Sequence, residues 1–397
     1  MTTTKNNEHK KLNAPNLKDK GNEFRNVPHL RFPEFEGEWE KCKLGELTTK
    51  VGSGSTPKGG NAVYTSVGHC FVRSQNVGMG YLILDDIAHI DDDIHQKHKA
   101  SELNEDDVLL NITGASIGRT AIATKEIEGG NVNQHVCIIR ANSKVNPKFL
   151  CNYIQTKKIQ NYIQSLQTGG SREGLNFEQI RSFPISLPNI AEQNKIAQLL
   201  DKLNERIATQ NKIIDKLKSL IKGIAQKIVH SNKPNVRLAE CLECKSSTLQ
   251  ESEVCEQGTY PVYGANGIVG YLDNYSTEGE AVYIIKDGSG VGTVSYVTGK
   301  CSATGTLNTL QAKEGYSLQY FYYLLKVFNF EPYKTGMAIP HIYFKDYGKA
   351  KVFCPSYTEQ LQYARLLYAI ESKLSIEKNI LTSLSLQKQY LLRQMFI

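Results

Sequence analysis

The chain has 397 residues, with 47 Lys or Arg against 40 Asp or Glu, and a formal net charge of +7. This length predicts two or three domains, and the small basic excess suits a polyanionic partner without requiring one. No run of 18 apolar residues occurs, so we expect no transmembrane helix, no membrane partner and a cytoplasmic location. The nine cysteines are an odd number and lie far apart, which favours reduced thiols over a disulfide framework.

The N-terminal segment, residues 1–26, is rich in Lys and Asn and has few large apolar side chains, so we expect a disordered tail. It lacks the continuous apolar stretch of a signal peptide. Short apolar anchors at Val27, Leu30 and Phe32 lead to Trp39 and predict the start of a folded unit at residue 27.

The first globule is predicted over residues 27–188 as short strands separated by glycine turns. Apolar runs indicate buried strands at 109–112, before Gly114, and at 136–139. Asn146 and Pro147 are typical of a helix start and predict a helix over 149–164. The segment is therefore an α+β domain.

A long helix is predicted over residues 189–231. From Ile196 its apolar residues recur in steps of four and three, the spacing of a coiled-coil seam that needs a partner helix. The predicted seam consists of Ile196, Leu200, Leu203, Ile207, Gln210, Ile214, Leu217 and Ile221.

The second globule, residues 232–355, repeats the plan of the first in fewer residues. A strand at 282–285 precedes Gly288 as 109–112 precede Gly114, and a helix at 318–328 stands where the first globule has 149–164. The pattern indicates two homologous α/β domains with little residue identity between them.

A second long helix, residues 356–397, begins 356 − 189 = 167 residues after the first and repeats its Glu-Gln pair and apolar spacing. Duplicated halves favour an antiparallel, pseudo-two-fold coiled coil, which sets Gln210 opposite Glu377 as a polar pair. Its predicted seam consists of Leu367, Ile370, Leu374, Glu377, Leu381, Leu384 and Leu391.

Motifs of catalysis are missing from the sequence. No glycine-rich loop is followed by Lys-Ser or Lys-Thr, and the segment 288–292 precedes a strand-like run, so we interpret it as a turn. The Asn146-Pro147-Lys148-Phe149 segment resembles the base-holding loop of amino-methyltransferases, but a helix N-cap is the simpler interpretation. The acidic residues Asp85, Asp86 and 91–93 lack a downstream Glu-x-Lys element and favour a solvated loop over a metal nuclease.

The cysteines allow one candidate metal site. Cys241 and Cys244 have the spacing of zinc ligands and could be completed by Cys255 and Cys301. Because the sequence holds no second close pair of cysteines, we expect no metal.

Glycine-rich polar loops in both globules are suited to nucleic acid, since Arg, Lys, Asn and Gln make bidentate contacts with base edges. Each residue taken singly is more often an ordinary surface residue. The candidates in the first globule are Lys58, Arg73, Gln75, Arg119, Gln134 and Arg172. Those in the second are Asn266, Lys286, Lys300, Lys334 and His341.

Several segments together resemble the specificity subunit of a type I restriction-modification system, and the resemblance covers the chain after the tail. They are 27–32 with Phe35, Gly37 and Trp39; 44–47; 185–188 with Glu192 and Gln193; and 260–268. The junction at Cys354-Pro355-Ser356 departs from the pattern of Leu187-Pro188-Asn189 and blurs the second boundary.

The resemblance implies a non-catalytic subunit. Each globule would be a target recognition domain for one half of a split sequence in double-stranded DNA, and the helices would be conserved spacers. Modification subunits, two by the symmetry of the spacers, would bind S-adenosylmethionine and methylate adenine. Restriction subunits would add ATP- and Mg-dependent translocation and cleavage, so we expect no cofactor on this chain.

Two other hypotheses remain open. The coiled coil could be an assembly scaffold with protein-binding globules, which predicts weak and salt-insensitive DNA binding, whereas a DNA-recognising subunit loses affinity steeply as salt rises. A self-sufficient nuclease or methyltransferase would be active with metal or S-adenosylmethionine alone.

Overall fold

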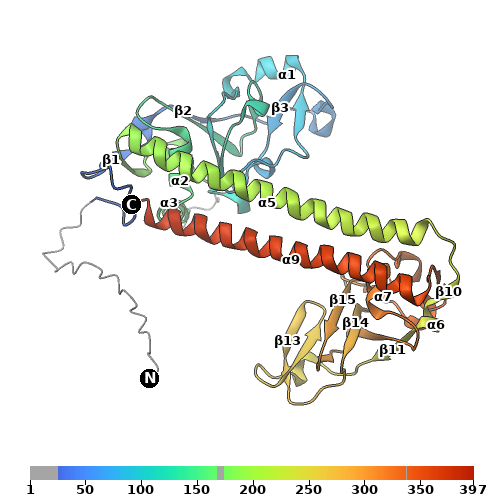
Figure 1. Cartoon of the computed structure of the whole chain (residues 1–397). Helices are drawn as coiled ribbons and strands as arrows, with labels where there is room; N and C mark the ends of the chain where they lie inside the picture. Colours follow the sequence, from blue (N-terminus) through green and yellow to red (C-terminus); the bar gives the residue numbers. More distant parts are fainter. Residues whose placement is uncertain (1–25, 168–173, 337) are drawn as a thin grey trace, which may run out of the picture. The chain divides into compact units, whose positions relative to one another are not determined.

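The computed structural model describes residues 26–167, 174–336 and 338–397. The chain divides into two compact units: unit 1 comprises Met1–Glu205 and Ser385–Ile397, and unit 2 comprises Arg206–Leu384. Each unit contains one α/β globule and part of both long helices, α5 (Ile190–His230) and α9 (Tyr357–Gln394) (Figure 1).

Unit 1 contains three small sheets. The main sheet is antiparallel with the order β2-β8-β5-β6, a second sheet has the order β4-β3-β7 with β3 and β7 parallel, and β1 pairs with β9. The strands are β1 (Glu40–Lys43), β2 (Thr48–Ser53), β3 (His69–Val72), β4 (Ala88–Ile90), β5 (Val108–Asn111), β6 (Thr120–Ile122), β7 (Asn131–Val132), β8 (Val136–Ala141) and β9 (Pro184–Leu187). The α-helices besides α5 and α9 are α1 (Asp92–Lys97), α2 (Pro147–Ile154), α3 (Lys157–Ser165) and α4 (Phe177–Arg181).

Unit 2 repeats this topology strand for strand. Its sheets have the orders β11-β17-β14-β15, β13-β12-β16 with β12 and β16 parallel, and β10-β18. The strands are β10 (Val236–Arg237), β11 (Leu242–Ser246), β12 (Tyr260–Gly264), β13 (Gly267–Leu272), β14 (Glu280–Ile285), β15 (Val294–Thr298), β16 (Ser302–Ala303), β17 (Leu307–Ala312) and β18 (Lys351–Val352). The helices are α6 (Leu238–Cys241), α7 (Leu318–Leu325) and α8 (Phe344–Tyr347). The predicted α+β duplication is therefore confirmed.

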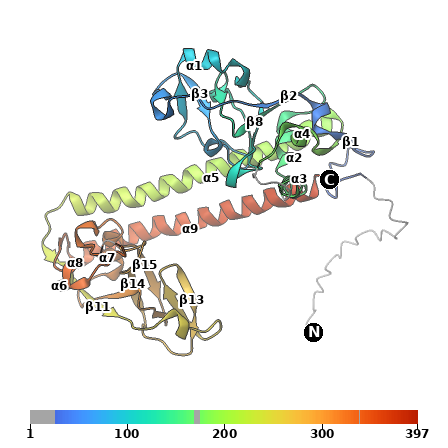
Figure 2. The same ribbon diagram turned by 180° about the vertical axis from the view of Figure 1, so that it is seen from behind.

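The long helices pair in opposite directions. In unit 1 the first turns of α5, with Ile196 and Leu200, share a core with Leu392 and Phe396 near the end of α9. In unit 2 the later part of α5, with Ile214 and Ile221, shares a core with Leu367 and Leu374 from the first half of α9. Figures 1 and 2 show α7 beside α9 in this unit. The antiparallel coiled coil is thus built from both cores.

The predicted seam residues lie on the inner side of this pair. In unit 2, Gln210 donates its Nε2 hydrogen to Glu377 Oε2 over 2.5 Å and to the Glu377 carbonyl over 3.1 Å, so the predicted polar pair is confirmed. The buried seam residues are Ile196, Leu200, Leu203, Gln210, Ile214, Ile221, Leu367, Leu374 and Leu384. The partly buried ones are Ile207, Leu217, Ile370, Glu377, Leu381 and Leu391.

The same glutamine joins each globule to a long helix. Gln193 Oε1 accepts a hydrogen bond from the backbone nitrogen of Asn146, the N-cap of α2, over 2.8 Å, and its Nε2 donates to the Pro188 carbonyl over 2.8 Å. Gln360, 167 residues later, accepts from the nitrogen of Ser317, the N-cap of α7, over 2.9 Å, and donates to the Pro355 carbonyl over 2.9 Å. Both side chains are buried, so these bonds orient the globule on the helix.

Four predicted details differ from the structure. Asn26, predicted in the tail, is buried and its side chain bonds to the Trp39 carbonyl, while residues 1–25 lie outside the described residues. The predicted helix 149–164 is two helices, because Thr156 is extended and its side chain caps α3. The predicted helix 318–328 ends at Leu325, where three-residue turns replace helical bonds. Asp91 caps α1, so 91–93 begin a helix, not a loop.

Candidate DNA-recognition surface

The loops at one end of the unit 1 sheets are hydrogen-bonded to one another. Gly54 donates to the Asn133 carbonyl over 3.3 Å, Asn133 to Val72 over 3.1 Å, and Ile112 to His135 over 3.0 Å. We call residues 54–58, 73–75, 112–119 and 133–135 loop surface 1. These bonds satisfy the backbone where the strands end, which fixes the loops in one arrangement.

Polar side chains of loop surface 1 also bond to one another. Thr113 Oγ1 and His135 Nδ1 are 2.5 Å apart, and the Gln134 amide nitrogen lies 3.0 Å from His135 Nε2. The Thr56 hydroxyl donates to Gln134 Oε1. Gln134 is exposed and His135 partly exposed, so this network borders solvent.

Unit 2 has the equivalent surface. Lys286 donates to the Thr306 carbonyl over 3.0 Å, Gly305 to Leu249 over 2.8 Å, and Gly288 to Pro340 over 3.0 Å. We call residues 247–249, 264–266, 286–293, 304–306 and 340–341 loop surface 2. Its polar network contains the Asp287 carboxylate, which accepts from His341 Nδ1 over 2.7 Å and from Lys286 Nζ over 2.9 Å.

Burial alone would raise the pKa of Asp287, but the hydrogen bonds from His341 and Lys286 outweigh burial and lower it. The carboxylate is therefore ionised at neutral pH, and it holds both cationic or polar side chains in fixed positions.

Most of the predicted candidates lie in these surfaces. Loop surface 1 contains the candidates Lys58, Arg73, Gln75, Arg119 and Gln134, and loop surface 2 contains Asn266, Lys286 and His341. Arg73 is partly held in place, because its guanidinium lies 5.5 Å from the Tyr64 ring centroid and donates to the Asp86 carbonyl over 3.4 Å. Arg172 lies outside the described residues.

Two candidates of the second globule lie elsewhere. Lys300 follows β15, where Gly299 bonds to Gly279 at the start of β14, the opposite end of that strand from Lys286. Its Nζ lies 4.6 Å from the Tyr275 ring centroid and 3.7 Å from Glu278. Lys334 lines a neighbouring pocket instead of loop surface 2 itself.

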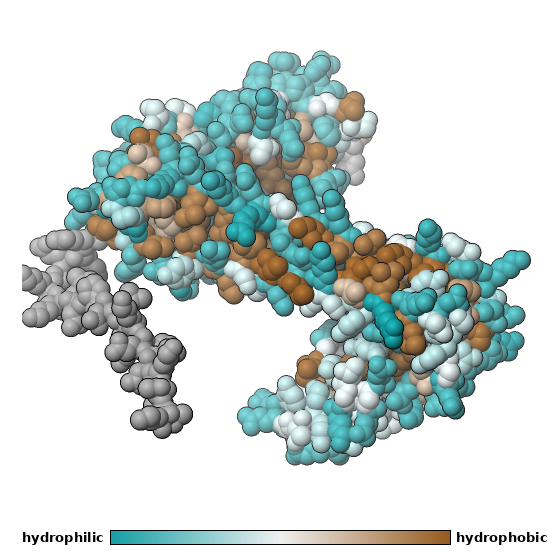
Figure 3. All heavy atoms as spheres, in the orientation of Figure 1, coloured by the Kyte–Doolittle hydropathy of each residue, from teal (hydrophilic) through white to brown (hydrophobic). Residues whose placement is uncertain are grey.

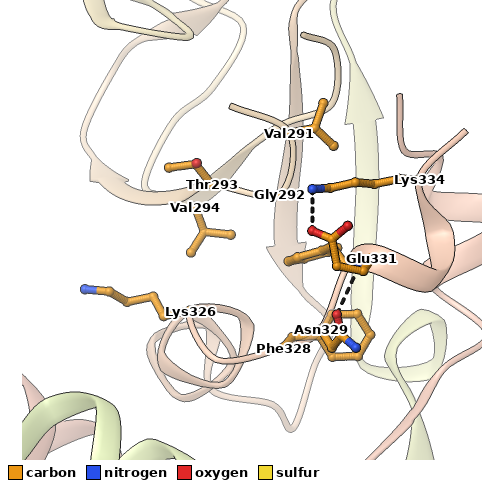
Figure 4. Close-up of a pocket in the computed structure, with 10 residues that line it drawn as sticks. Val291, Gly292, Thr293, Val294, Lys326, Phe328, Asn329, Glu331 and Lys334 are labelled. Carbon is orange, nitrogen blue, oxygen red and sulfur yellow. Dashed lines mark hydrogen bonds and ion pairs between the residues drawn. The ribbon is translucent and has the colours of Figure 1, made fainter. Parts of the chain in front are cut away.

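That pocket, of about 430 Å³, lies between the turn 291–294 and the segment after α7 (Figure 4). Lys334 Nζ bonds to Glu331 over 2.5 Å, and the Asn329 side chain accepts from the Glu331 nitrogen over 3.0 Å. Lys326 lines it too but is bonded to Glu371 over 2.8 Å. Both lysines are thus neutralised by carboxylates.

Sequence patterns did not single out Thr113, Asp287 and Thr306 as site residues. One signal was present: Thr113 and Asp287 each directly precede the glycine that follows a buried strand, Gly114 and Gly288. Both glycines have positive φ, 69° and 95°, so the same tight turn brings both residues to the surface.

Within the described parts of the chain, no three His, Cys, Asp or Glu side chains are grouped to hold a metal ion. The described helices also include none long and apolar enough to cross a membrane. None of the nine cysteines, all in described segments, forms a disulfide.

A family model described as the type I restriction modification DNA specificity domain matches the sequence twice, over residues 36–219 and 231–386. The chain belongs to the type I restriction-modification DNA specificity family. The two matches each contain one globule with its loop surface, so the duplication seen in the sheets is a duplication of the specificity domain.

Individual members of the family agree with this. The chain is 24% identical over 309 residues to a putative type I specificity subunit of Mycoplasma genitalium, which covers 72% of this chain and 79% of that protein. It is 24% identical over 165 residues to the EcoBI specificity subunit of Escherichia coli, or 40% of this chain and 33% of that one.

Solved structures share the fold. The crystal structure of a type I restriction-modification S subunit from M. genitalium superposes with a TM-score of 0.65 at 18% identity, covering 94% of this chain and 99% of the other. A chain from a structural study of type I complex assembly and conformational transition gives 0.51 at 17% identity, covering 90% and 97%.

Proposed function

We propose that this chain recognises a bipartite DNA sequence, one half-site through each loop surface, and directs adenine methylation and restriction carried out by partner subunits. The observation that carries the proposal is the repeated specificity domain, in which the same strand order ends in the same hydrogen-bonded polar loops. Side chains on such loops can reach base edges, while Lys and Arg beside them contact phosphates.

The long helices supply a surface for the modification subunits. Leu199 and Leu366 are 37% and 49% exposed, and they occupy equivalent positions 167 residues apart on α5 and α9. Ile213 and Ile380 form a second such pair, partly exposed and 39% exposed. Figure 3 shows apolar side chains gathered on the exposed side of α9 in unit 2.

Exposed apolar residues outside the seam are typical of a helix that packs against further helices. Because each copy of the repeat carries the pair, we propose two docking sites and therefore two modification subunits. Those subunits would hold S-adenosylmethionine, and restriction subunits would hold ATP and Mg, in a cytoplasmic complex in which this chain is the non-catalytic component.

The function is tested by co-expressing the chain with its modification subunit in a host without adenine methylation and mapping methylated adenines by single-molecule sequencing. We expect one motif of two short half-sites separated by a fixed gap. DNA binding by the purified complex should weaken steeply with salt. A complex that forms but methylates no split motif contradicts the proposal.

Docking is tested separately with Ile380→Glu, which places a charge in the proposed interface, and with Asn379→Glu on the neighbouring exposed position as control. We expect Ile380→Glu alone to weaken co-purification of the modification subunit. Equal behaviour of both variants contradicts this docking site.

A further inference from the structure

The residues that follow β5 and β14 occupy the same backbone positions but carry different chemistry. Ile112 donates to the His135 carbonyl and accepts from Leu175 over 2.9 Å, while Lys286 donates to Thr306 and accepts from Ile342 over 2.9 Å. The next residues, Thr113 and Asp287, bridge to Gly174 and His341. Four positions therefore match by hydrogen bonding: 112 with 286, 113 with 287, 135 with 306 and 174 with 341.

None of these four positions holds the same residue in both units. Unit 1 has Ile112, Thr113, His135 and Gly174, and unit 2 has Lys286, Asp287, Thr306 and His341. A constant backbone with variable side chains at the edge of a recognition surface is the arrangement expected where two domains distinguish different sequences.

The unit 2 cluster fixes the protonation of His341. A carboxylate only accepts hydrogen bonds, so the 2.7 Å contact from His341 Nδ1 to Asp287 Oδ1 places a hydrogen on Nδ1. In the neutral ring Nε2 then carries a lone pair. The His341 side chain is 35% exposed, so this acceptor is within reach of a ligand.

The equivalent imidazole of unit 1 differs in this respect. His135 comes from the other loop, and its Nε2 already lies 3.0 Å from the Gln134 amide nitrogen, which is a donor. Gln134 is therefore the outermost polar group of that network, and the exposed acceptor on an imidazole is a property of unit 2.

Building on the proposed function, we propose that His341, oriented by Asp287, is a specificity-determining residue of the second half-site. Its Nε2 accepts a hydrogen bond from the exocyclic amino group of adenine or cytosine in the major groove. These amino groups are the only base-edge donors there, whereas guanine and thymine present acceptors at the corresponding places.

The test is Asp287→Asn in the complex with modification subunits. The asparagine amide can donate to His341 Nδ1, which moves the ring hydrogen to Nε2 and turns the acceptor into a donor. We expect one position of the second half-site to change from adenine or cytosine toward guanine or thymine by roughly tenfold, with the first half-site unchanged. Selection from DNA with randomised half-sites measures both.

His341→Ala is the second variant, and Lys300→Ala, at the other end of β14, is the control. His341→Ala should lose roughly tenfold selectivity at the same position, and Lys300→Ala should retain it. If Asp287→Asn does not fold, His341→Ala decides alone.

Unchanged second-half-site selectivity in His341→Ala overturns this inference while leaving the bipartite function intact. A wild-type complex that selects no bipartite sequence overturns the proposed function and this inference together.

Discussion

Buried charged and amide side chains connect the globules to the long helices. The Glu192 carboxylate is fully buried and accepts two hydrogen bonds from Arg31, from Nε to Oε1 and from a terminal nitrogen to Oε2, both 2.8 Å long. Its hydrogen bond to Glu192 raises the pKa of Arg31. The segment before β1 is thereby attached to the start of α5 in unit 1.

Replacement of Arg31 by Met should destabilise unit 1 by about 3–5 kcal/mol, because the buried Glu192 charge loses its partner. Denaturant unfolding of the chain measures this loss. The double variant Arg31→Met/Glu192→Met should recover much of it. Glu359→Met is the matched control, since Glu359 occupies the equivalent position but is exposed and bonded to Ser356. Equal effects at Glu192 and Glu359 would contradict the assignment.

Single residues were the hardest feature to predict. The Glu-Gln pair of each long helix was visible in the sequence, but the role of Gln193 and Gln360 depends on N-cap nitrogens more than 40 residues away. Lys388 illustrates the same limit: it falls on the heptad spacing of α9, and in unit 1 it donates to Gln155 over 2.9 Å, where burial lowers its pKa. Such contacts are created by tertiary packing and leave no local pattern.

At the scale of elements, one polar pair interrupts the coiled-coil seam of unit 2. Gln210 is buried and bonds to Glu377, an arrangement that specifies register at a cost in stability. The double variant Gln210→Leu/Glu377→Leu should therefore raise the melting temperature. Gln210→Leu alone should lower it, because Glu377 would lose its partner. A double variant less stable than the wild type would contradict this role.

Helix α7 is attached to α9 by Glu371, which accepts from Lys326 and from the Tyr323 hydroxyl, each over 2.8 Å. Burial would raise the pKa of Glu371, but the hydrogen bonds from Lys326 and Tyr323 outweigh it and lower the pKa. A carboxyl with a lowered pKa stabilises the fold above its unfolded value, and the stabilisation disappears as the pH falls through the folded value.

Glu371→Gln should therefore be less stable than the wild type near pH 7. The difference in unfolding free energy should shrink as the pH falls below about 4.3, the ordinary pKa of glutamate. Unfolding curves at several pH values measure this. A difference that stays constant with pH would show that the charge of Glu371 does not matter.

Elements were predicted well where one periodicity continues. The heptad spacing was sufficient for α5 and α9, and buried strands were found at β5, β8 and β14. The helix predicted over 149–164 was wrong at Thr156, because a local side-chain cap outweighs an otherwise suitable helical pattern.

At the scale of the whole molecule, α5 and α9 each contribute residues to both units. If the helices set the separation of the two half-sites, seven residues inserted in each at matched positions should lengthen the unread gap. One heptad adds roughly 10 Å at 1.5 Å per residue, or about three base pairs, and keeps the seam in register. Mapping methylated adenines measures the gap, and an unchanged gap would contradict the ruler.

The sequence by itself determined the duplication, the two helical seams and their polar pair, because these depend on periodicity and on a fixed 167-residue offset between two copies. Tertiary structure alone decided which loop residues share a surface. It placed Lys286 and His341 together on Asp287 and left Lys300 at the far end of β14. The physical reason is that loop side chains gather through the ends of strands that are distant in the chain, and sequence spacing contains no record of that pairing.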